Sequence, residues 1–119
     1  MQLLPVGFVL AALAVIFGAF GAHALSETLT PERLVTWETA VRYQMYSGLG
    51  IALSSLHPRL QGKGSRMLLL GAAIFSGSLY LLCLTDVRIL GAITPIGGVC
   101  MIAGWLQLAW ASTRIKEDE

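Results

Sequence analysis

The sequence predicts an all-α membrane protein: a four-helix transmembrane bundle of two antiparallel hairpins, with span four kinked at Pro95. Three observations predict this class. The 119 residues are 55% hydrophobic and 13% charged, and the charged share is about half that of an average soluble domain. Apolar segments alternate with short polar links. The segment 75–98 is apolar on nearly every face, a pattern that suits a helical hairpin in a bilayer.

The chain is expected to form a single integral membrane domain, residues 1–119, without a separate soluble domain. Its net charge is +1, and it has no run of lysine and arginine residues interleaved with aromatic residues. Nucleic acid is therefore excluded as a partner. The expected spans are about 3–25, 40–57, 67–85 and 89–112, with an interfacial lead-in at about 31–39.

The first span follows from a run without charge. Residues 1–26 contain no charged side chain, and at 1.5 Å per residue this run exceeds the ~30 Å hydrocarbon thickness. It is too long for a secretory signal and lacks a basic start, so we expect a span. Ala14, Gly18 and Ala22 recur every four residues and are expected to form a helix-packing stripe, and Gly77 is expected to pack in the same way in span three.

The second helix is predicted to begin at Pro31 and to end near His57. Thr30 is a suitable N-cap, proline is favoured at the first helical position, and Pro58 prevents the helix from continuing. The position of Thr30 directly before Pro31 makes this the clearest helix start in the chain.

The second span has a short apolar part. The charge-free stretch 43–58 covers only ~24 Å, less than the hydrocarbon thickness. Arg42 is therefore expected to lie near an interface. Glu38 lies one helical turn before Arg42, in the favourable order for an ion pair. The preceding segment, 31–39, is expected to lie in the interface as an amphipathic lead-in.

The third and fourth spans form a hairpin. The basic linker 58–66 precedes span three, for which Ser65 is the expected N-cap. The next link, 85–88, is so short that the two spans must be antiparallel neighbours. Asp86 is the expected cap of span four.

Span four has unusual local chemistry. Pro95 cannot donate a hydrogen bond to the carbonyl of Gly91, and two glycines follow, so the helix is expected to kink or break. A broken helix can line a binding site in a transporter. The alternative, which we favour because no second broken span is present, is a kinked helix whose freed groups are met by nearby hydroxyls. The candidate helix-break site comprises Ser76, Ser78, Thr94, Pro95, Gly97 and Gly98.

The basic residues predict the orientation. The linker and the C-terminal tail share one side of the membrane and carry five basic residues, Arg59, Lys63, Arg66, Arg114 and Lys116. The other side has three, Arg33, Arg42 and Arg88. The positive-inside rule therefore places both termini in the cytoplasm.

Five short motifs occur in order along the chain: Gly18 to His23, Tyr43-Gln44, Phe75 to Tyr80, Thr94 to Gly98, and Gly104-Trp105. In these the chain resembles the YgdD/YwdK family of small bacterial inner-membrane proteins, which has a four-span counterpart in animals. The resemblance implies four membrane helices, the bacterial plasma membrane and no assigned molecular activity. Ser47 stands where the family usually has a histidine, so an obligatory imidazole at that position is not supported.

A candidate polar cluster lies at the outer side of the first two spans. An up-down pairing brings the end of span one and the start of span two together, and polar side chains at membrane depth are costly unless they face protein or water. They form either a functional site or a hydrogen-bonded clasp between helices, and we favour the clasp. The cluster comprises His23, Glu38, Arg42, Gln44 and Ser47.

Enzyme chemistry is not expected. Cys83 and Cys100 lie in apolar runs without further ligands nearby, and His57 lies far from His23, so no metal site, cofactor or catalytic residue is predicted. We expect a structural or interaction module whose partners are the lipid bilayer and either a second copy or another membrane protein. The alternative is a small-molecule or ion transporter or channel that acts as an oligomer, since four spans leave no pore in one copy.

Overall fold

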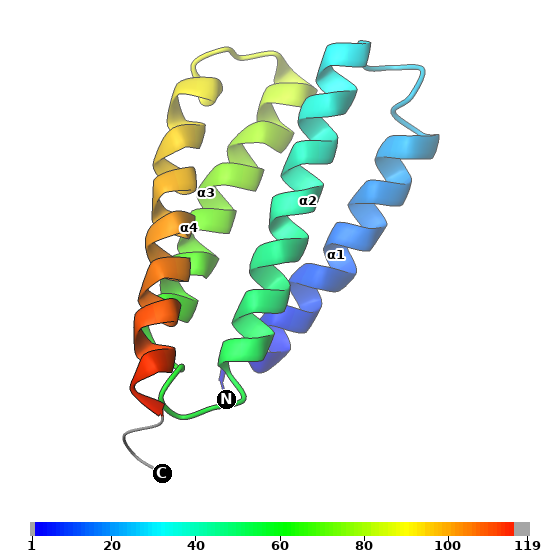
Figure 1. Ribbon diagram of the computed structural model, residues 1–119. Coiled ribbons are helices and arrows are strands. Elements are labelled where there is room, and N and C mark those ends of the chain that lie inside the picture. The colour runs from blue at the N-terminus through cyan, green and yellow to red at the C-terminus, as the bar shows by residue number, and fades with distance from the viewer. Residues whose placement is uncertain (1, 116–119) are drawn as a thin grey trace.

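The computed structural model describes residues 2–115 and consists of four long helices: α1 (Leu4–His23), α2 (Pro31–Ser54), α3 (Lys63–Thr85) and α4 (Leu90–Thr113). No strand occurs among the described residues. The helices run alternately up and down (Figure 1), so α1 with α2 and α3 with α4 form two antiparallel hairpins. This confirms the predicted all-α class. The helices α1, α3 and α4 are long and apolar enough to cross a membrane.

The helices pack in chain order. The backbone of α1 lies beside α2, that of α2 beside α3, and that of α3 beside α4. Side chains add contacts between helices that are not neighbours in the chain: Phe17 of α1 reaches Tyr80 of α3, and Met101 of α4 reaches Ser47 of α2. The molecule measures 54 × 26 × 19 Å. It is therefore an elongated slab, in which α1 is held mainly by α2.

Glycines allow the closest helix approaches. A Cβ atom on Gly7 of α1 would lie 2.6 Å from the backbone nitrogen of Ala52 of α2. A Cβ atom on Gly71 of α3 would lie 2.7 Å from the backbone nitrogen of Met101, and one on Gly97 of α4 would overlap the backbone of Phe75. Both hairpins are therefore closed by direct contact of backbones, which small residues permit in membrane helices.

The observed packing positions differ in part from the expected stripe. Ala14 is fully buried, and a Cβ atom on Gly18 would contact Val41 of α2. Ala22, however, is exposed, and a Cβ atom on Gly77 would have no neighbour within 4 Å. The expectation was wrong for both residues. For Ala22 the reason is that a spacing of four drifts around the helix, whereas the buried face of α1 follows Gly7, Ala14 and Gly21 at a spacing of seven.

The second helix begins as predicted. The backbone N–H of Arg33 donates to the hydroxyl of Thr30 at 3.2 Å, and Pro31 occupies the first helical turn. The helix ends at Ser54 instead of near His57. The hydroxyls of Ser54 and Ser55 both donate to the carbonyl of Ile51. Such local bonds compete with the continuation of a helix.

The third helix begins at Lys63, earlier than the apolar run indicates. Gly62 precedes it with a φ of 112°, and Ser65 lies inside the helix and is not its N-cap. The hydroxyl of Ser65 lies 2.6 Å from that of Ser54. Hydropathy marks the apolar part of a span, whereas the helix itself extends into the polar linker.

One expectation for the second hairpin was wrong, and the favoured reading of span four agrees with a continuous helix. Asp86 does not cap α4: it ends α3 in a left-handed conformation, with a φ of 57°, and pairs with Arg33. The helix α4 runs through Pro95 without a break. A proline removes one backbone donor, and the neighbouring hydrogen bonds of a long helix can persist around it.

Candidate functional site

Gln44 joins three helices through its side chain. Its side chain is buried in the middle of α2. Its amide nitrogen donates to the carbonyl of Leu10 in α1 at 2.9 Å, and its amide oxygen accepts from the hydroxyl of Tyr80 in α3 at 2.6 Å. One side chain therefore fixes α2 against both of its neighbours.

Hydroxyl groups make further connections between helices. Ser76 of α3 donates to the carbonyl of Ala40 in α2 at 2.7 Å. The hydroxyls of Ser78 in α3 and Thr94 in α4 lie 2.6 Å apart, so that one donates to the other. The hydroxyl that accepts this bond can donate its own proton to a carbonyl of its own helix. Ser47 of α2 donates to the sulfur of Met101 in α4 at 3.3 Å.

The buried polar groups of the described residues are all satisfied. No buried side-chain nitrogen or oxygen atom in this part of the chain lacks a hydrogen-bond partner. In a low-dielectric interior an unpaired polar group is costly, so this arrangement stabilises the bundle. Each buried polar side chain of these residues is therefore paired within the bundle.

The structure does not gather the predicted polar cluster into one site. His23 is exposed at the end of α1. Glu38 and Arg42 are exposed on α2 and pair with each other at 3.2 Å. Gln44 and Ser47 lie on the buried face of α2 and contact different helices. The cluster is thus divided between an outer ion pair and an inner set of hydrogen bonds.

The predicted helix-break residues are also divided. Ser78 and Thr94 contact each other, whereas Ser76 bonds to α2. Pro95 is exposed. Gly97 is buried against α3, and Gly98 is half-buried beside the ring of Phe75. These residues serve two helix contacts and do not line a common cavity.

Sequence reasoning missed two aromatic residues of the interior. The ring nitrogen of Trp37 in α2 donates to the carbonyl of Phe17 in α1 at 2.8 Å. The ring of Tyr80 packs against those of Trp37 and Phe17, with centroid distances of 4.6 Å and 5.3 Å. A buried tyrosine or tryptophan normally finds a partner for its polar atom, which is the signal that could have identified both residues.

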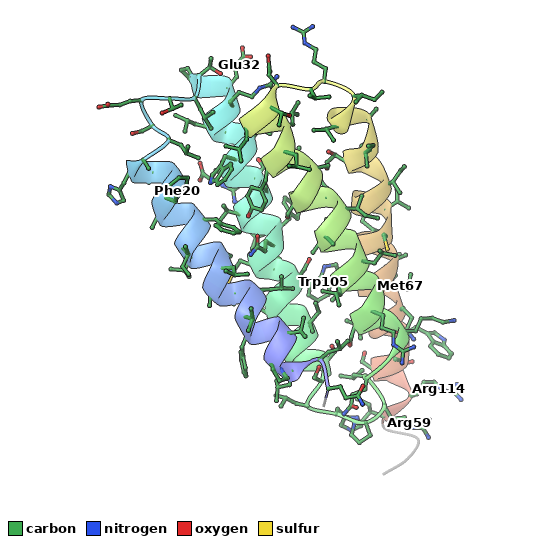
Figure 2. All side chains as sticks on the ribbon, turned by 180° about the vertical axis from the view of Figure 1, so that it is seen from behind. Phe20, Glu32, Arg59, Met67, Trp105 and Arg114 are labelled. Carbon is green, nitrogen blue, oxygen red and sulfur yellow. The ribbon has the colours of Figure 1, made fainter. Side chains whose placement is uncertain are left out.

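A groove lies between α1 and α3, over the Gln44–Tyr80 pair. Its volume is about 210 Å³, and most of its lining is apolar. Figure 2 shows this side of the molecule, with α1 and α3 toward the viewer. The lining residues are Leu10, Leu13, Phe17, Gln44, Leu69, Ala72, Ala73, Ser76, Gly77 and Tyr80. Gly77 faces this groove, which explains why it contacts no other helix.

Two larger hollows lie at the ends of the molecule. One of about 660 Å³ lies beside the 55–62 linker and is lined by polar groups that include Gln61, Ser65 and Arg66. The other, of about 490 Å³, lies between α1 and α2 toward the opposite end and is lined by Trp37 and Glu38, among others.

An ion pair missed by sequence reasoning connects α2 to the α3–α4 loop. The guanidinium of Arg33 lies 2.6 Å from the carboxylate of Asp86. The hydrogen bond and the positive charge of Arg33 hold the pKa of Asp86 below its ordinary value of 3.8. The same hydrogen bond raises the pKa of Arg33. This contact joins the two hairpins at their loop end.

Metal-ligating side chains do not converge within residues 2–115. No group of three histidine, cysteine or acidic residues in this range could hold a metal ion. Both cysteines are free thiols, and each donates to a backbone carbonyl of another helix: Cys83 to that of Arg33 and Cys100 to that of Met67. In this arrangement the thiols contribute to helix contacts.

Comparison with known proteins gives a consistent result. The family "Protein of unknown function (DUF423)" matches residues 17–98. A UPF0382 membrane protein of Staphylococcus haemolyticus is 51% identical over 76% of this chain and 78% of its own length. The UPF0382 membrane protein YwdK of Bacillus subtilis is 42% identical over 91% and 93% of the two chains. The UPF0382 inner membrane protein YgdD of Escherichia coli is 36% identical over 92% and 85%. No solved structure gives a significant match.

Proposed function

The chain belongs to the DUF423 family, whose relatives are membrane proteins without an assigned activity, and on that premise we propose that it is a structural module of the bilayer. In this proposal it acts through contacts between membrane helices and not through catalysis. The observation that carries the proposal is the three-helix junction at Gln44. Its amide nitrogen donates to the carbonyl of Leu10, and its amide oxygen accepts from Tyr80, both in the same chain.

The other polar side chains support the same proposal. The hydroxyls of Ser76 and Ser78 bond to helix carbonyls and to Thr94. An activated serine needs a base within hydrogen-bonding reach, and the hydrogen-bond partners of these two serines are backbone carbonyls and the hydroxyl of Thr94. The proposed role of these hydroxyls is to fix helix register.

The proposed location is the bacterial plasma membrane, crossed four times, with both termini in the cytoplasm. The name of YgdD, an inner membrane protein, supports the location. Arg59, Lys63, Arg66 and Arg114 lie at one end of the molecule, and Arg33 and Arg88 at the other. Figure 2 shows Arg59 and Arg114 at the end opposite Glu32. The basic end is expected to face the cytoplasm. Lys116, part of the same prediction, lies outside the described residues.

The fourth crossing rests on the packing of α2. Contacts between α1 and α2 extend from Phe17 and Trp37 near one end to Gly7 and Ala52 near the other. Because α1 is long enough to span the bilayer, a helix that follows it over this length supports the proposal that α2 crosses as well.

A transporter is the second candidate, because the groove between α1 and α3 presents an amide and a phenol at membrane depth. A flux measurement separates the two. The protein is reconstituted into vesicles of phosphatidylethanolamine and phosphatidylglycerol that contain a pH-sensitive dye and a potassium gradient. The structural proposal predicts the same decay of both gradients as in empty vesicles. Flux that is lost in a folded Gln44→Leu variant would overturn it.

A further inference from the structure

The hollow of about 660 Å³ beside the 55–62 linker, which we call the linker hollow, lies where three helices have their ends. Its lining includes Gln2, Ser55, Gln61, Gly62, Ser65 and Arg66. These residues come from the segment before α1, the end of α2 and the first turn of α3. The volume falls within the range of about 300–1,000 Å³ that is typical of sites for small molecules.

The linker hollow lies at the level of lipid headgroups when α3 crosses the bilayer. The 23 residues of α3 span about 35 Å, slightly more than the ~30 Å of the hydrocarbon region. Gly62, Ser65 and Arg66, which line the hollow, lie at the very start of this helix. The phosphate groups of the lipids therefore reach the same depth as the hollow.

This end of the molecule is positively charged over the described residues. Its basic residues are Arg59, Lys63, Arg66 and Arg114. The acidic residues of the described range belong to the opposite half of the molecule, and they are Glu27, Glu32, Glu38 and Asp86. Glu117, Asp118 and Glu119 lie outside that range. A surface of one sign raises the local concentration of ions of the other sign, so this end favours an anion.

Arg66 is the basic residue that lines the hollow. Its side chain is exposed, and it makes no ion pair with another described residue. A guanidinium presents several N–H groups in a planar fork that matches the oxygen atoms of a phosphate. The side chain of Arg66 is therefore available to an anion in the hollow.

Neutral donors lie beside Arg66. The side-chain amide of Gln61 donates to the carbonyl of Ser55 at 3.1 Å, and an amide has a second N–H group. No side chain of the described residues caps the first turn of α3, where backbone N–H groups have no acceptor within the helix. Such groups bind phosphate when a cation is also present. The hollow thus combines a cation with neutral donors.

We infer that the linker hollow binds the phosphate group of an anionic ligand, with Arg66 as its ionic contact. Two sources offer this chemistry: the phosphodiester of an anionic phospholipid, and a small soluble phosphate ester on the same side of the membrane. The inference goes beyond the proposed structural module, because it assigns a ligand and a site that the helix contacts do not require.

Lipid binding to the full chain tests the site. The protein in maltoside micelles is titrated with phosphatidylglycerol or, as a neutral reference, with phosphatidylcholine, and native mass spectrometry counts the bound lipid. We expect phosphatidylglycerol to bind about tenfold more tightly than phosphatidylcholine. Arg66→Gln should remove about tenfold of that affinity, the effect of losing one charge-assisted contact. Equal affinity of the wild type for both lipids, without a response to phosphate, would overturn the inference.

Two matched variants separate the site from general charge. Lys63→Gln removes a charge from the same end, at an exposed residue that does not line the hollow. Arg88→Gln removes an exposed charge from the α3–α4 loop. At physiological salt, where surface charges are screened, we expect each to lower the affinity about twofold at most. Equal losses in Arg66→Gln and Lys63→Gln would contradict a site in the hollow. Circular dichroism verifies that each variant forms its helices.

Inorganic phosphate separates the two sources. Thermal unfolding in micelles is measured in sodium phosphate and in sodium chloride of the same ionic strength. A melting temperature that rises in phosphate, and does not rise in Arg66→Gln, would assign the hollow to a soluble phosphate ester. Binding of phosphatidylglycerol that depends on Arg66, without a response to phosphate, would assign it to a lipid headgroup. Binding that is independent of Arg66 in both measurements would overturn the inference.

The inference and the proposed function fail separately. A chain that binds neither probe, and leaves both gradients intact, would overturn the phosphate site and leave the structural module standing. Flux that requires Gln44 would overturn the structural module, whether or not the linker hollow binds phosphate.

Discussion

The side chain of Gln44 joins α1, α2 and α3 through the hydrogen bonds of its amide. Replacing Tyr80 with phenylalanine removes one donor and keeps the ring. We expect the free energy of unfolding to fall by ~0.6 kcal/mol, the average for a hydrogen bond between membrane helices. Gln44→Leu removes both bonds and leaves the Tyr80 hydroxyl unpaired, so it should cost about 1–3 kcal/mol.

Reversible unfolding in mixed detergent and lipid micelles measures both variants. A Tyr80→Phe protein that loses more stability than Gln44→Leu would contradict the three-helix junction, because the amide makes the additional bond to Leu10.

The glycines provide a matched pair of variants. Gly97→Ala would place a methyl group against the backbone of Phe75, and the helices would have to separate. We expect a loss of about 1–3 kcal/mol, as in other overpacked sites. Gly77→Ala meets nothing within 4 Å and should leave the melting temperature unchanged or raise it slightly, since alanine favours the helix. Equal losses in the two variants would show that the close approach of α3 and α4 is not formed.

Sequence reasoning identified several of these residues but not their partners. Gln44, Ser76, Ser78 and Thr94 stand out because polar groups in apolar spans need hydrogen bonds. Their pairing depends on how each helix is rotated about its axis, which a nearly uniform apolar surface does not specify. For this reason Tyr80, the partner of Gln44, was not recognised as part of the site.

At the scale of whole elements, the contact between Arg33 and Asp86 joins α2 to the loop between α3 and α4. Because the folded pKa of Asp86 lies below its ordinary value of 3.8, its contribution to stability is fully present above that value. It is lost as the pH falls through the lower, folded pKa. We therefore expect Asp86→Asn to lower the melting temperature at pH 7 and to have little effect well below pH 3.8.

Melting curves of wild type and variant across this pH range measure the difference. The matched control is Glu27→Gln, which removes an exposed carboxylate from the other loop at this end. A difference between wild type and Asp86→Asn that persists unchanged into strong acid would contradict an ionic contact.

The helix boundaries show what hydropathy can and cannot define. The start of α2 was predictable because Thr30 and Pro31 fix it through local hydrogen bonding and a fixed φ. The start of α3 was not, because its first turn is polar and carries no hydropathy signal. The cap predicted at Asp86 was wrong because this residue ends α3 in the left-handed conformation common after a helix, and its carboxylate accepts from Arg33.

For the molecule as a whole, the topology can be measured directly. On a background with Cys83→Ala and Cys100→Ala, Gln61→Cys reports on the linker end and Val87→Cys on the opposite loop. In intact cells we expect a membrane-impermeant maleimide to label Val87→Cys and to leave Gln61→Cys unlabelled until the membrane is opened. The reverse pattern would place the termini outside, and labelling of both residues would contradict four crossings.

The class of fold was predictable from sequence, and the arrangement of the helices was not. Long apolar runs with short links require membrane helices in antiparallel hairpins. They do not specify whether four helices close into a square or spread into a slab. That choice depends on individual contacts. Gly7 and the amide of Gln44 hold α1 to α2, and Gly97 holds α4 to α3.

The unequal hydropathy of the helices has a consequence for biogenesis. When α2 leaves the ribosome, insertion of its charged half into lipid alone would be unfavourable. The insertion free energy is about 2.5–3.5 kcal/mol for each charge near the centre of a span. The preceding helix, already inserted, offers Gly7, Gly21 and the carbonyl of Leu10 as a ready docking strip. The α1 helix would thus assist the insertion of α2 during translation. In a chain that lacks α1, we expect α2 to remain at the membrane surface.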